Sequence, residues 1–511
     1  MANHKVALIE FSVFQGVFPL ASGYLEATAS NDPRLEGELE FEKYSFCVSS
    51  PGIAEKIDQI EADVYGFSCY VWNTGLVKRL LPRLLAQRPR AQVILGGPQV
   101  MNKADLYLAP EHESLVLCNG EGEVTFTDYL VELASNEPDL RNVNGLSFYR
   151  GGELVTTPKQ ERLMDLNQIP SPYLGGYLES RGEYVWAVIE TNRGCPFKCT
   201  YCYWGAATNA KVHKYDLDRI LEELTWLSEN AVVYVFFADA NFGMLKRDLE
   251  IAHHLADLKK KNGHPITVYF SSSKNTPDRV TEITKVFDEA GMVATQPISL
   301  QTVSMDTLEN VKRSNIKKSS YTDLQRVLNE RGLSSFLEMI WPLPGETLSS
   351  FKQGIGELCG LGADSFMIYP LLLINNVEMD QQRDEYGLVT IDDPDPNSEA
   401  EIVIETKDVS HTEYLEGLRF SYHVTSLYTA RGLRHLGRYL DSTGRMGFSE
   451  LLSAFSDFCH QASDNPYSEH IEETLAASGQ YKFSSVGGIA HIALHTGGKE
   501  FDDLLSSFVR S

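Results

Sequence analysis

The sequence has few positive charges: 45 Lys and Arg stand against 70 Asp and Glu, for a formal net charge of −25. Such a surface repels phosphate backbones and anionic headgroups, which excludes nucleic acid and an anionic membrane surface as main partners. Long hydrophobic runs are also missing. No apolar run approaches 18 residues, and residues 1–10, MANHKVALIE, predict a short strand instead of a signal peptide.

Cysteine is scarce, and most of it is scattered. Of 8 cysteines, five stand singly, as is typical of buried small hydrophobic residues in a reducing compartment: Cys47, Cys69, Cys118, Cys359 and Cys459. This usage predicts a cytoplasmic protein. There is no second cysteine cluster, so we expect no auxiliary iron–sulfur cluster.

The other three cysteines lie together in residues 191–204, TNRGCPFKCTYCYW. Cys195, Cys199 and Cys202 have the spacing C-x3-C-x2-C, which is tight enough to place three thiolates on one metal centre. A structural zinc site or a closed iron–sulfur cluster normally takes four protein ligands. A zinc site would need a distant fourth ligand, and the nearest downstream histidine, His213, has no second candidate ligand beside it. The spacing instead favours a four-iron four-sulfur cluster with one iron left open for a small molecule.

Strand and helix patterns alternate through the first 140 residues, which indicates a parallel, doubly wound sheet. Buried strands are predicted at residues 5–11, 62–68, 91–95 and 114–118, and a helix at 75–87 carries Pro82 inside it. Such sheets bind ligands at the carboxyl ends of their strands. Those ends carry turn-rich runs: SCYVWN at 68–73, GGPQ at 96–99 and NGEGE at 119–123.

Alternation resumes after a connecting stretch at about residues 141–182. Six further strands are predicted, at residues 184–190, 232–237, 266–270, 294–300, 335–340 and 365–369. The cysteine loop follows directly after the first of these strands. This pattern predicts a partial (β/α)6 barrel, and active sites of such barrels lie at the carboxyl ends of the strands.

The cysteine loop resembles that of radical S-adenosylmethionine (radical SAM) enzymes, whose open iron chelates the amine and carboxylate of SAM. The resemblance extends to residues at successive strand ends, including the turn LPGET at 343–347. It implies that SAM contacts Tyr201, Asp239, Asn241, Gln301 and Arg313. The pair Asn375-Asn376 departs from the family, where Pro-Gly-Thr is frequent, which suggests a rim shaped for a particular substrate.

The GGPQ and NGEGE turns resemble the cobalamin-binding domain that precedes the core in one large subfamily of radical SAM enzymes. The resemblance implies cobalamin contacts at eight residues: Ser68, Tyr70, Trp72, Gly96, Gly97, Pro98, Gly120 and Glu121. The Asp-x-His-x-x-Gly motif that supplies a histidine to cobalt is absent, so the resemblance implies a lower face without histidine. Trp72 looks like the residue that some members place beneath cobalt, and a packing aromatic remains the alternative.

Together these features predict four parts: a cobalamin-binding domain at 1–140, a linker at 141–182, a radical SAM core at 183–388 and a helical carboxy-terminal domain at 389–511. In the last part helices are clearest at 412–440 and 448–459, and we expect them to cap the barrel mouth and exclude water.

The resemblance implies a cobalamin-dependent radical SAM methyltransferase with a [4Fe-4S] cluster, SAM and cobalamin as cofactors. It would methylate an unactivated carbon of a small molecule or peptide by means of a 5′-deoxyadenosyl radical and methylcobalamin. A reductant such as flavodoxin or ferredoxin is implied as a partner. Three alternatives stay open: a cyclase, rearrangement or oxidation enzyme with the same cofactors, a tRNA methylthiotransferase that uses Cys47, Cys69 and Cys118, and a non-enzymatic cobalamin carrier or sensor.

Overall fold

The computed structural model describes residues 4–179, 182–204, 208–273, 276–293, 295–314, 318–429, 431–462, 464–478 and 483–511. The chain begins with a seven-stranded sheet in the order β2-β1-β3-β4-β5-β6-β7. Its first five strands are parallel, and its last two are antiparallel additions. The strands are β1 His4–Ser12, β2 Leu39–Cys47, β3 Val64–Ser68, β4 Gln92–Gly96, β5 Leu115–Cys118, β6 Leu146–Arg150 and β7 Glu153–Thr156.

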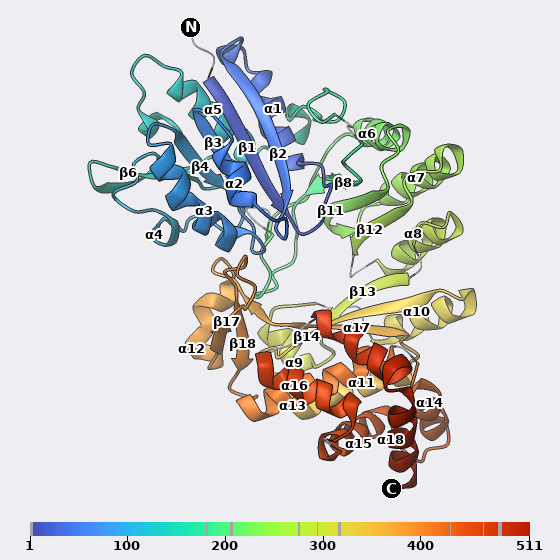
Figure 1. The fold of residues 1–511 in the computed structure, drawn as a ribbon. Coiled ribbons are helices and arrows are strands. Elements are labelled where there is room, and N and C mark those ends of the chain that lie inside the picture. Colours follow the sequence, from blue (N-terminus) through green and yellow to red (C-terminus); the bar gives the residue numbers. More distant parts are fainter. Residues whose placement is uncertain are drawn as a thin grey trace.

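Helices cover both faces of this sheet, as the doubly wound prediction requires (Figure 1). Helices α1 (Leu20–Ser30) and α5 (Gly122–Leu133) pack on one face. Helices α2 (Ile53–Asp58), α3 (Thr74–Gln87) and α4 (Ala104–Tyr107) pack on the other. Both faces are buried, which is why these strands read as continuous apolar runs.

Two features of the sheet differ from the sequence prediction. Strand β2 was not predicted, because its run LEFEKYSFC alternates charged and apolar residues at the edge of the sheet. The hairpin β6–β7 lies in the stretch assigned to a linker, yet β6 pairs with β5. The sheet therefore extends to Thr156, beyond the expected boundary at residue 140.

The barrel strands form two three-stranded parallel ladders, β8-β11-β12 and β13-β14-β15. The bounds are β8 Trp186–Ile189, β11 Tyr234–Phe242, β12 Thr267–Ser272, β13 Thr295–Gln301, β14 Ser334–Trp341 and β15 Ser365–Pro370. All six predicted strands are present. The short hairpin of β9 (Asn192–Arg193) and β10 (His213–Lys214) encloses the cysteine loop.

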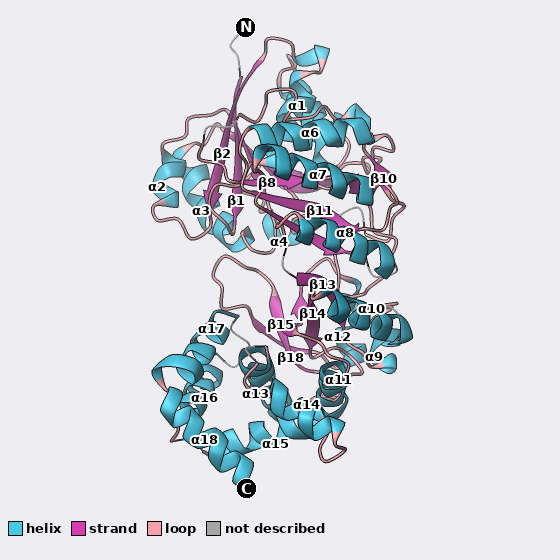
Figure 2. Cartoon of the chain, turned by 90° about the vertical axis from the view of Figure 1, so that its right-hand side faces the viewer, coloured by secondary structure: helices cyan, strands magenta, loops and turns pink. Residues whose placement is uncertain are grey.

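Each ladder has a hydrophobic core of its own. The first packs on α6 (Leu217–Glu229), α7 (Asp248–Asn262) and α8 (Pro277–Glu289), together with Phe18, Leu20 and Tyr24 from the amino-terminal domain. The second packs on α10 (Lys318–Arg331) and α11 (Leu348–Gly360), together with carboxy-terminal helices. Figure 2 shows the two halves of the barrel one above the other.

The carboxy-terminal region is mainly helical but does not begin as helix. Strands β16 (Leu372–Leu373), β17 (Val389–Asp392) and β18 (Glu401–Glu405) form a small antiparallel sheet. The other elements after β15 are α12 Arg383–Tyr386, α13 His411–His423, α14 Arg434–Ser442, α15 Phe448–Gln461, α16 Pro466–Ser478, α17 Phe483–His491 and α18 Gly498–Arg510; the short α9, Met305–Asn310, lies earlier, after β13.

Two expectations for this region need correction. The helical segment predicted over 412–440 is not one continuous α-helix: a π-helical turn, Val424–Tyr428, follows α13, and Arg431 has a φ of 70°. Helix α13 also forms no part of the expected cap over the barrel mouth, because it lies on the outer side of β14. There a Cβ on Gly417 would stand 2.5 Å from the Trp341 ring, so the helix and the strand approach closely only with glycine at this position.

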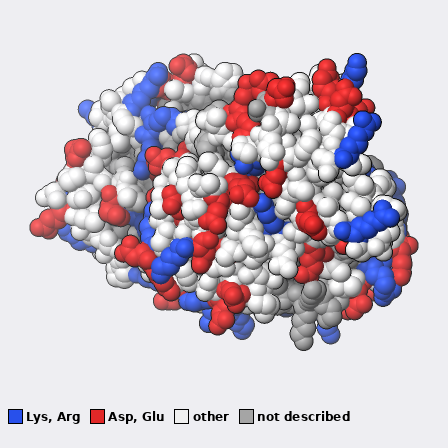
Figure 3. Space-filling model, turned by 90° about the horizontal axis from the view of Figure 1, so that it is seen from below, with Lys and Arg blue, Asp and Glu red and all other residues white. Residues whose placement is uncertain are grey.

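Charge is mixed over the surface seen from below. Figure 3 shows Asp and Glu interspersed with Lys and Arg on this face, without one large field of a single sign.

Candidate functional site

The cysteine loop is held between the two halves of the barrel. Asn241, at the end of β11, donates from Nδ2 to Cys195 Sγ over 3.4 Å. Arg313, which follows α9, approaches Cys199 Sγ with Nη1 at 3.9 Å. Gly194 enters the loop with a φ of 125°, and a Cβ there would lie 2.5 Å from the Lys211 carbonyl, so glycine is needed at this turn.

None of the three cysteines of the loop is in a disulfide among the described residues; Cys199 is buried, and Cys195 and Cys202 are partly exposed. Within the described ranges, no group of three or more His, Cys, Asp or Glu side chains is arranged to hold a single metal ion. A four-iron cluster does not require such a group, because each thiolate binds a different iron. His213, the candidate zinc ligand, instead bonds through Nδ1 to the Met164 carbonyl at 2.9 Å. The donor set therefore fits a cluster held by three thiolates.

Asp239 is buried, and both oxygens of its carboxylate accept hydrogen bonds from the protein. Its carboxylate accepts hydrogen bonds from Thr191 N at 2.8 Å, Asn192 N at 3.2 Å and Asn192 Nδ2 at 2.9 Å, as well as from the Thr191 hydroxyl. Burial raises the pKa of Asp239 from 3.8 to about 7, and these hydrogen bonds oppose the rise. The contacts assign Asp239 to fixing the segment that leads into the cysteine loop, whereas the resemblance implied direct contact with SAM.

Three neighbouring strand ends carry buried polar atoms without hydrogen-bond partners in the described part of the chain: Asn241 Oδ1, Ser273 Oγ and Gln301 Oε1. Gln301 also has a φ of 71°, next to an irregularity in the β13–β14 register. A non-glycine residue in the left-handed region at a strand end is a mark of functional sites. These atoms fit the polar groups of SAM, and Ser273 was not singled out from the sequence.

Arg313 joins the cysteine loop to the second half of the barrel. Its guanidinium donates to Tyr201 OH at 2.8 Å and to the Ser299 carbonyl of β13. Only 7% of Arg313 is exposed, so its positive charge is enclosed by the cysteine loop, Tyr201 and strand β13. Burial is the main cause that raises the pKa of Tyr201. Both residues thus lie beside the cluster ligands, and their contact with SAM stays a prediction.

The LPGET turn after β14 is fixed by Glu346, which is buried and accepts hydrogen bonds from the Thr302 hydroxyl and, over 2.8 Å, from Ser350 Oγ. Burial raises the pKa of this carboxyl. Thr347 then caps α11 through a capping box with Ser350. The turn is therefore a rigid part of the rim.

The cobalamin-binding edge centres on the point where the strand order reverses, between β1 and β3. Trp72, just past the end of β3 at Ser68, donates from Nε1 to the Phe11 carbonyl of β1 at 3.1 Å. Its ring stacks on Tyr70 with centroids 4.5 Å apart and an interplanar angle of 3°. Trp72 stays 37% exposed, so a flat aromatic surface is presented at the crevice.

The glycine turns complete this edge. Gly97, between Gly96 and Pro98, has a φ of 105°, and a Cβ there would meet the Cys69 carbonyl at 2.5 Å, whereas Gly120 faces open space. Gln99 is buried, and its Nε2 has no hydrogen-bond partner in the described chain. An open glycine and a free amide donor fit a large polar cofactor. Gln99 was quoted within the turn but not assigned as a contact.

Glu121, the last of the implied cobalamin contacts, pairs with Arg162 at 2.9 Å. Both histidines of the amino-terminal domain lie at the opposite edge of the sheet. His4 begins β1, and His112 lies just before β5. Because the two strands are parallel, neither side chain stands at the carboxyl ends where ligands bind.

Contacts that sequence reasoning missed join the two sites. Arg193 pairs with Glu123 of the NGEGE turn at 2.7 Å and with Glu190 at 2.8 Å, and 11% of its side chain is exposed. Asn376 donates from Nδ2 to the Pro98 carbonyl at 2.7 Å. Arg193 belongs to the cysteine-rich run at 191–204, and Asn376 belongs to the Asn375-Asn376 pair that departs from the family. The sequence therefore marks both positions, but it does not indicate which residues they contact.

Comparison with known proteins agrees with this arrangement. The radical SAM superfamily matches residues 189–356, and the B12 binding domain matches residues 36–130. The structure of the cobalamin-dependent S-adenosylmethionine radical enzyme OxsB, with aqua-cobalamin and S-adenosylmethionine bound, aligns with a TM-score of 0.62 at 15% identity, over 99% of this chain and 81% of that one. The radical S-adenosylmethionine methyltransferase TsrM from Kitasatospora setae aligns with a TM-score of 0.54 at 16% identity, over 77% and 80%. These likenesses show the fold.

Two curated relatives are each 33% identical. The cobalamin-dependent radical SAM methyltransferase TokK from Streptomyces tokunonensis matches over 86% of this chain and 67% of its own length. The 2-(S-pantetheinyl)-carbapenam-3-carboxylate methyltransferase from Streptantibioticus cattleyicolor matches over 84% and 66%. The chain thus spans about two thirds of the length of these relatives. It belongs to the cobalamin-dependent radical SAM methyltransferases.

The protein is therefore a radical SAM enzyme whose cofactors are a [4Fe-4S] cluster, SAM and cobalamin. Among the described residues, no helix is both long and apolar enough to cross a bilayer. Cys47, Cys69 and Cys118, which the methylthiotransferase alternative required, are buried on the cobalamin-binding sheet. Burial raises the pKa of Cys118 to about 12, which keeps this thiol neutral.

Proposed function

We propose that the enzyme transfers a methyl group to an unactivated carbon of a small, carbapenam-type molecule that carries a pantetheinyl chain. One structural observation supports the methyl transfer. The amino-terminal domain contacts segments beside both the first and the last barrel strand: Val185 N and Trp186 N donate to the Gly16 carbonyl at 2.8 and 2.9 Å, and Asn376 donates to the Pro98 carbonyl. The cobalamin-binding edge therefore faces the open side of the partial barrel, where one substrate can reach both cofactors.

The inner surface of the first barrel half supports an apolar ligand. Alternate residues of β8, β11 and β12 are buried against the outer helices, so their neighbours face inward. These inward residues include Trp186, whose ring stacks on those of Tyr234 and Tyr269, with ring centroids 4.2 and 5.3 Å apart. Phe14, from the loop after β1, stacks on Trp186 at 4.7 Å. Trp186, Tyr234 and Tyr269 stand toward the amino ends of β8, β11 and β12, so this aromatic wall lines the end of the lumen opposite the cysteine loop. It offers apolar contact to the part of a substrate that extends inward from the SAM site.

The inner surface of the second half is polar. Glu338 of β14 accepts hydrogen bonds from the Ser299 hydroxyl and from Tyr369 OH, the latter at 3.3 Å. A pantetheinyl chain carries amide N–H and hydroxyl donors that a carboxylate can accept. We therefore assign Glu338 and Tyr369 to orienting the substrate's side chain. The relative named for a pantetheinyl-carbapenam substrate supports this class.

The residues of the chain bind, orient and shield, and the cofactors supply the radical and the methyl group. Cys195, Cys199 and Cys202 would hold the cluster, with Asn241 and Arg313 beside them. Asn241, Gln301 and Arg313 would bind SAM, and the stacked Tyr70 and Trp72 would contact the cobalamin. Asp239 acts indirectly, by fixing Thr191 and Asn192. Reaction also needs a one-electron reductant, for which we propose flavodoxin or ferredoxin.

Anaerobic reconstitution with iron, sulfide, cobalamin and SAM tests the proposal. With a pantetheinyl carbapenam as substrate, we expect methylated product, S-adenosylhomocysteine and 5′-deoxyadenosine. The variant Cys195→Ala/Cys199→Ala/Cys202→Ala should lose the iron and all 5′-deoxyadenosine. Formation of 5′-deoxyadenosine without S-adenosylhomocysteine would instead identify a cyclase, rearrangement or oxidation enzyme.

The substrate assignment has its own test. Glu338→Gln removes the carboxylate charge while keeping the shape of the side chain. We expect KM for the substrate to rise roughly 10- to 100-fold, in line with about 1.5–3 kcal/mol for a hydrogen bond to a charged group, while SAM cleavage without substrate stays unchanged. Glu357→Gln, a change on the outer helix α11, serves as the control. An unchanged KM for Glu338→Gln would contradict the proposed orientation.

A further inference from the structure

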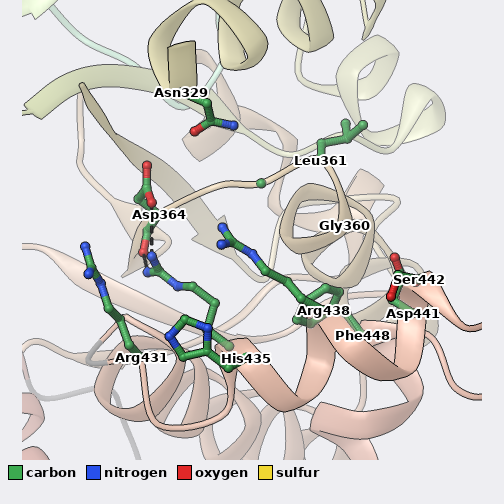
Figure 4. A pocket seen from close by; sticks show the side chains of 12 residues that line it. Asn329, Gly360, Leu361, Asp364, Arg431, His435, Arg438, Asp441, Ser442 and Phe448 are labelled. Atoms are coloured by element: carbon green, nitrogen blue, oxygen red, sulfur yellow. Dashed lines mark hydrogen bonds and ion pairs between the residues drawn. The ribbon is translucent and has the colours of Figure 1, made fainter. Parts of the chain in front are cut away.

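A cavity of about 670 Å³ opens far from the cysteine loop, between α14 and the segment that joins α11 to β15. Figure 4 shows the side chains of its lining. The lining residues are Asn329, Gly360, Leu361, Gly362, Asp364, Arg431, Arg434, His435, Arg438, Asp441, Ser442 and Phe448. Its volume lies within the roughly 300–1,000 Å³ of small-molecule sites.

Positive charge gathers in this cavity although the protein carries a net charge of −25. Arg431, His435 and Arg438 reach into the same space beside Asp364 (Figure 4). In the described part of the chain, none of the three forms an ion pair with an acidic side chain. Asp441 stands on the lining as well, one turn after Arg438, yet no ion pair joins them. The three basic side chains are therefore available to an anionic ligand.

Arg434 forms a fixed basic floor. It is only 3% exposed, and Nη1 pairs with Asp364 Oδ1 at 3.0 Å. Asp364 is itself held in place, because its Oδ2 accepts from Ser335 N at 3.0 Å. Arg434 Nε is buried without a hydrogen-bond partner in the described chain. A buried guanidinium N–H without an acceptor is unfavourable unless a ligand or water supplies one.

The backbone around the cavity is also unusual. Arg431 has a φ of 70°, although the next residue, Gly432, could adopt such a conformation at lower cost. It follows the π-helical turn Val424–Tyr428. π-helical turns and non-glycine residues in the left-handed region both concentrate at functional sites. Here the conformation carries the Arg431 side chain to the cavity.

The cavity is separate from the radical site. Asp364 precedes the first residue of β15, and Ser335 lies at the start of β14. The cavity is therefore at the amino ends of these strands, whereas the cysteine loop and the SAM-facing residues follow carboxyl ends. Six residues of β15 alone separate the two ends, a distance of about 20 Å at roughly 3.3 Å per residue.

We propose that this cavity binds a small phosphorylated molecule, with its phosphoryl group between Arg431, His435 and Arg438 above the Arg434 floor. Arginine forks match phosphate oxygens bidentately, and several such groups in one cavity select phosphate over a single carboxylate. Phe448 offers an apolar surface for the rest of the ligand, and Asp441 and Ser442 offer acceptors for its hydroxyl groups.

Calorimetric titration of the full chain with pyrophosphate and, separately, with inorganic phosphate tests the site. We expect saturable binding of pyrophosphate that weakens by about tenfold or more in Arg438→Gln and further in Arg431→Gln/Arg438→Gln, which corresponds to at least about 1.4 kcal/mol. Arg438→Lys keeps the charge but loses the fork, and should fall between the wild type and Arg438→Gln. Arg445→Gln, at an arginine that packs over Tyr439 outside the cavity, should bind as the wild type does.

Two controls keep the test decisive. Circular dichroism and thermal unfolding verify that each variant is folded, and SAM cleavage should stay unchanged because the site is remote from the cluster. No saturable heat with pyrophosphate, equal affinity in wild type and both glutamine variants, or equal competition by citrate would overturn the proposal. Binding of anionic phospholipid vesicles in place of soluble pyrophosphate would overturn it too.

Discussion

The first three barrel strands pack with the cobalamin-binding domain, whereas the last three pack with the carboxy-terminal helices. The first half supplies the cysteine loop and Asn241, and the second supplies Gln301 and Arg313. The SAM site that we propose is thus complete only where the halves meet. A protein built in this way can stabilise each half by its own core and still depend on a few polar contacts across the seam for function.

The largest effect is expected at the contact between the first half and the cobalamin-binding domain. Arg193→Met leaves the buried Glu123 and the partly buried Glu190 without their cation. Breaking a buried pair in this way should lower the free energy of unfolding by about 3–5 kcal/mol. Urea denaturation followed by tyrosine and tryptophan fluorescence measures the change.

Arg326→Met is the matched control, because Arg326 forms an exposed pair with Glu330 at 2.7 Å. Its removal should leave the unfolding curve essentially unchanged. Equal behaviour of the two variants would show that the Arg193 cluster does not hold the domains together.

The next effect is expected at the seam itself. Arg313→Ala removes the donor that joins Cys199 and Tyr201 to the Ser299 carbonyl of β13. We expect 5′-deoxyadenosine formation to fall roughly 10- to 100-fold, in line with about 1.5–3 kcal/mol for charge-assisted hydrogen bonds. Iron content should be retained, because the three cysteines remain. Loss of the iron together with the activity would assign Arg313 to holding the cluster loop instead of SAM.

Acid should act oppositely on the two halves. In the first, burial raises the pKa of Asp239 to about 7 and of Asp248 to about 6, so the folded state binds more protons than the unfolded state as pH falls below 7. These groups gain stability on acidification. In the second, burial lowers the pKa of His423 from 6.5 to about 3, so only the unfolded state takes up this proton.

His423 should therefore cost the second half up to about 1.4 kcal/mol per pH unit as pH falls from 6.5 toward 3, and the raised pKa of Glu346 opposes part of this loss. Hydrogen exchange at pH 7 and 5.5, corrected for intrinsic rates, should show protection falling in α13 and α15 before β8 and β11. In His423→Phe, which cannot be protonated, this selective loss should disappear. Persistence of the loss in that variant would exclude His423 as its cause.

The smallest effect is expected at the rim. Asn376→Ala removes the hydrogen bonds to the Pro98 and Gln99 carbonyls of the glycine turn. We expect hydroxocobalamin to bind a few-fold more weakly, from about 0.5–1.5 kcal/mol for such bonds. Asn142→Ala, at an exposed asparagine of the same domain that bonds only weakly to Glu132 at 3.4 Å, should leave the affinity unchanged.

Local pattern was sufficient wherever a residue's role depends on its near neighbours in sequence. The C-x3-C-x2-C spacing and the runs of apolar residues in all parallel central strands are local, so the cluster ligands and the barrel strands could be predicted. Edge strand β2 could not, because it alternates charge with apolar residues and owes its pairing to β1. The break at Arg431 was missed for a similar reason: helix propensity says nothing of a cavity beside the chain.

The sequence by itself indicated the cofactors, through three cysteines in the spacing of radical SAM enzymes and two glycine turns that resemble those of a cobalamin-binding domain. The tertiary structure decided which of the implied residues are free to meet those cofactors. Asp239 accepts hydrogen bonds from Thr191 and Asn192, whereas one side-chain oxygen each of Asn241 and Gln301 has no hydrogen-bond partner among the described residues. It also decided that the cobalamin edge faces the barrel's open side, because hydrogen bonds such as Asn376 to Pro98 join residues far apart in the chain. Spacing along a sequence identifies ligands, and only long-range packing determines whether their polar atoms remain available.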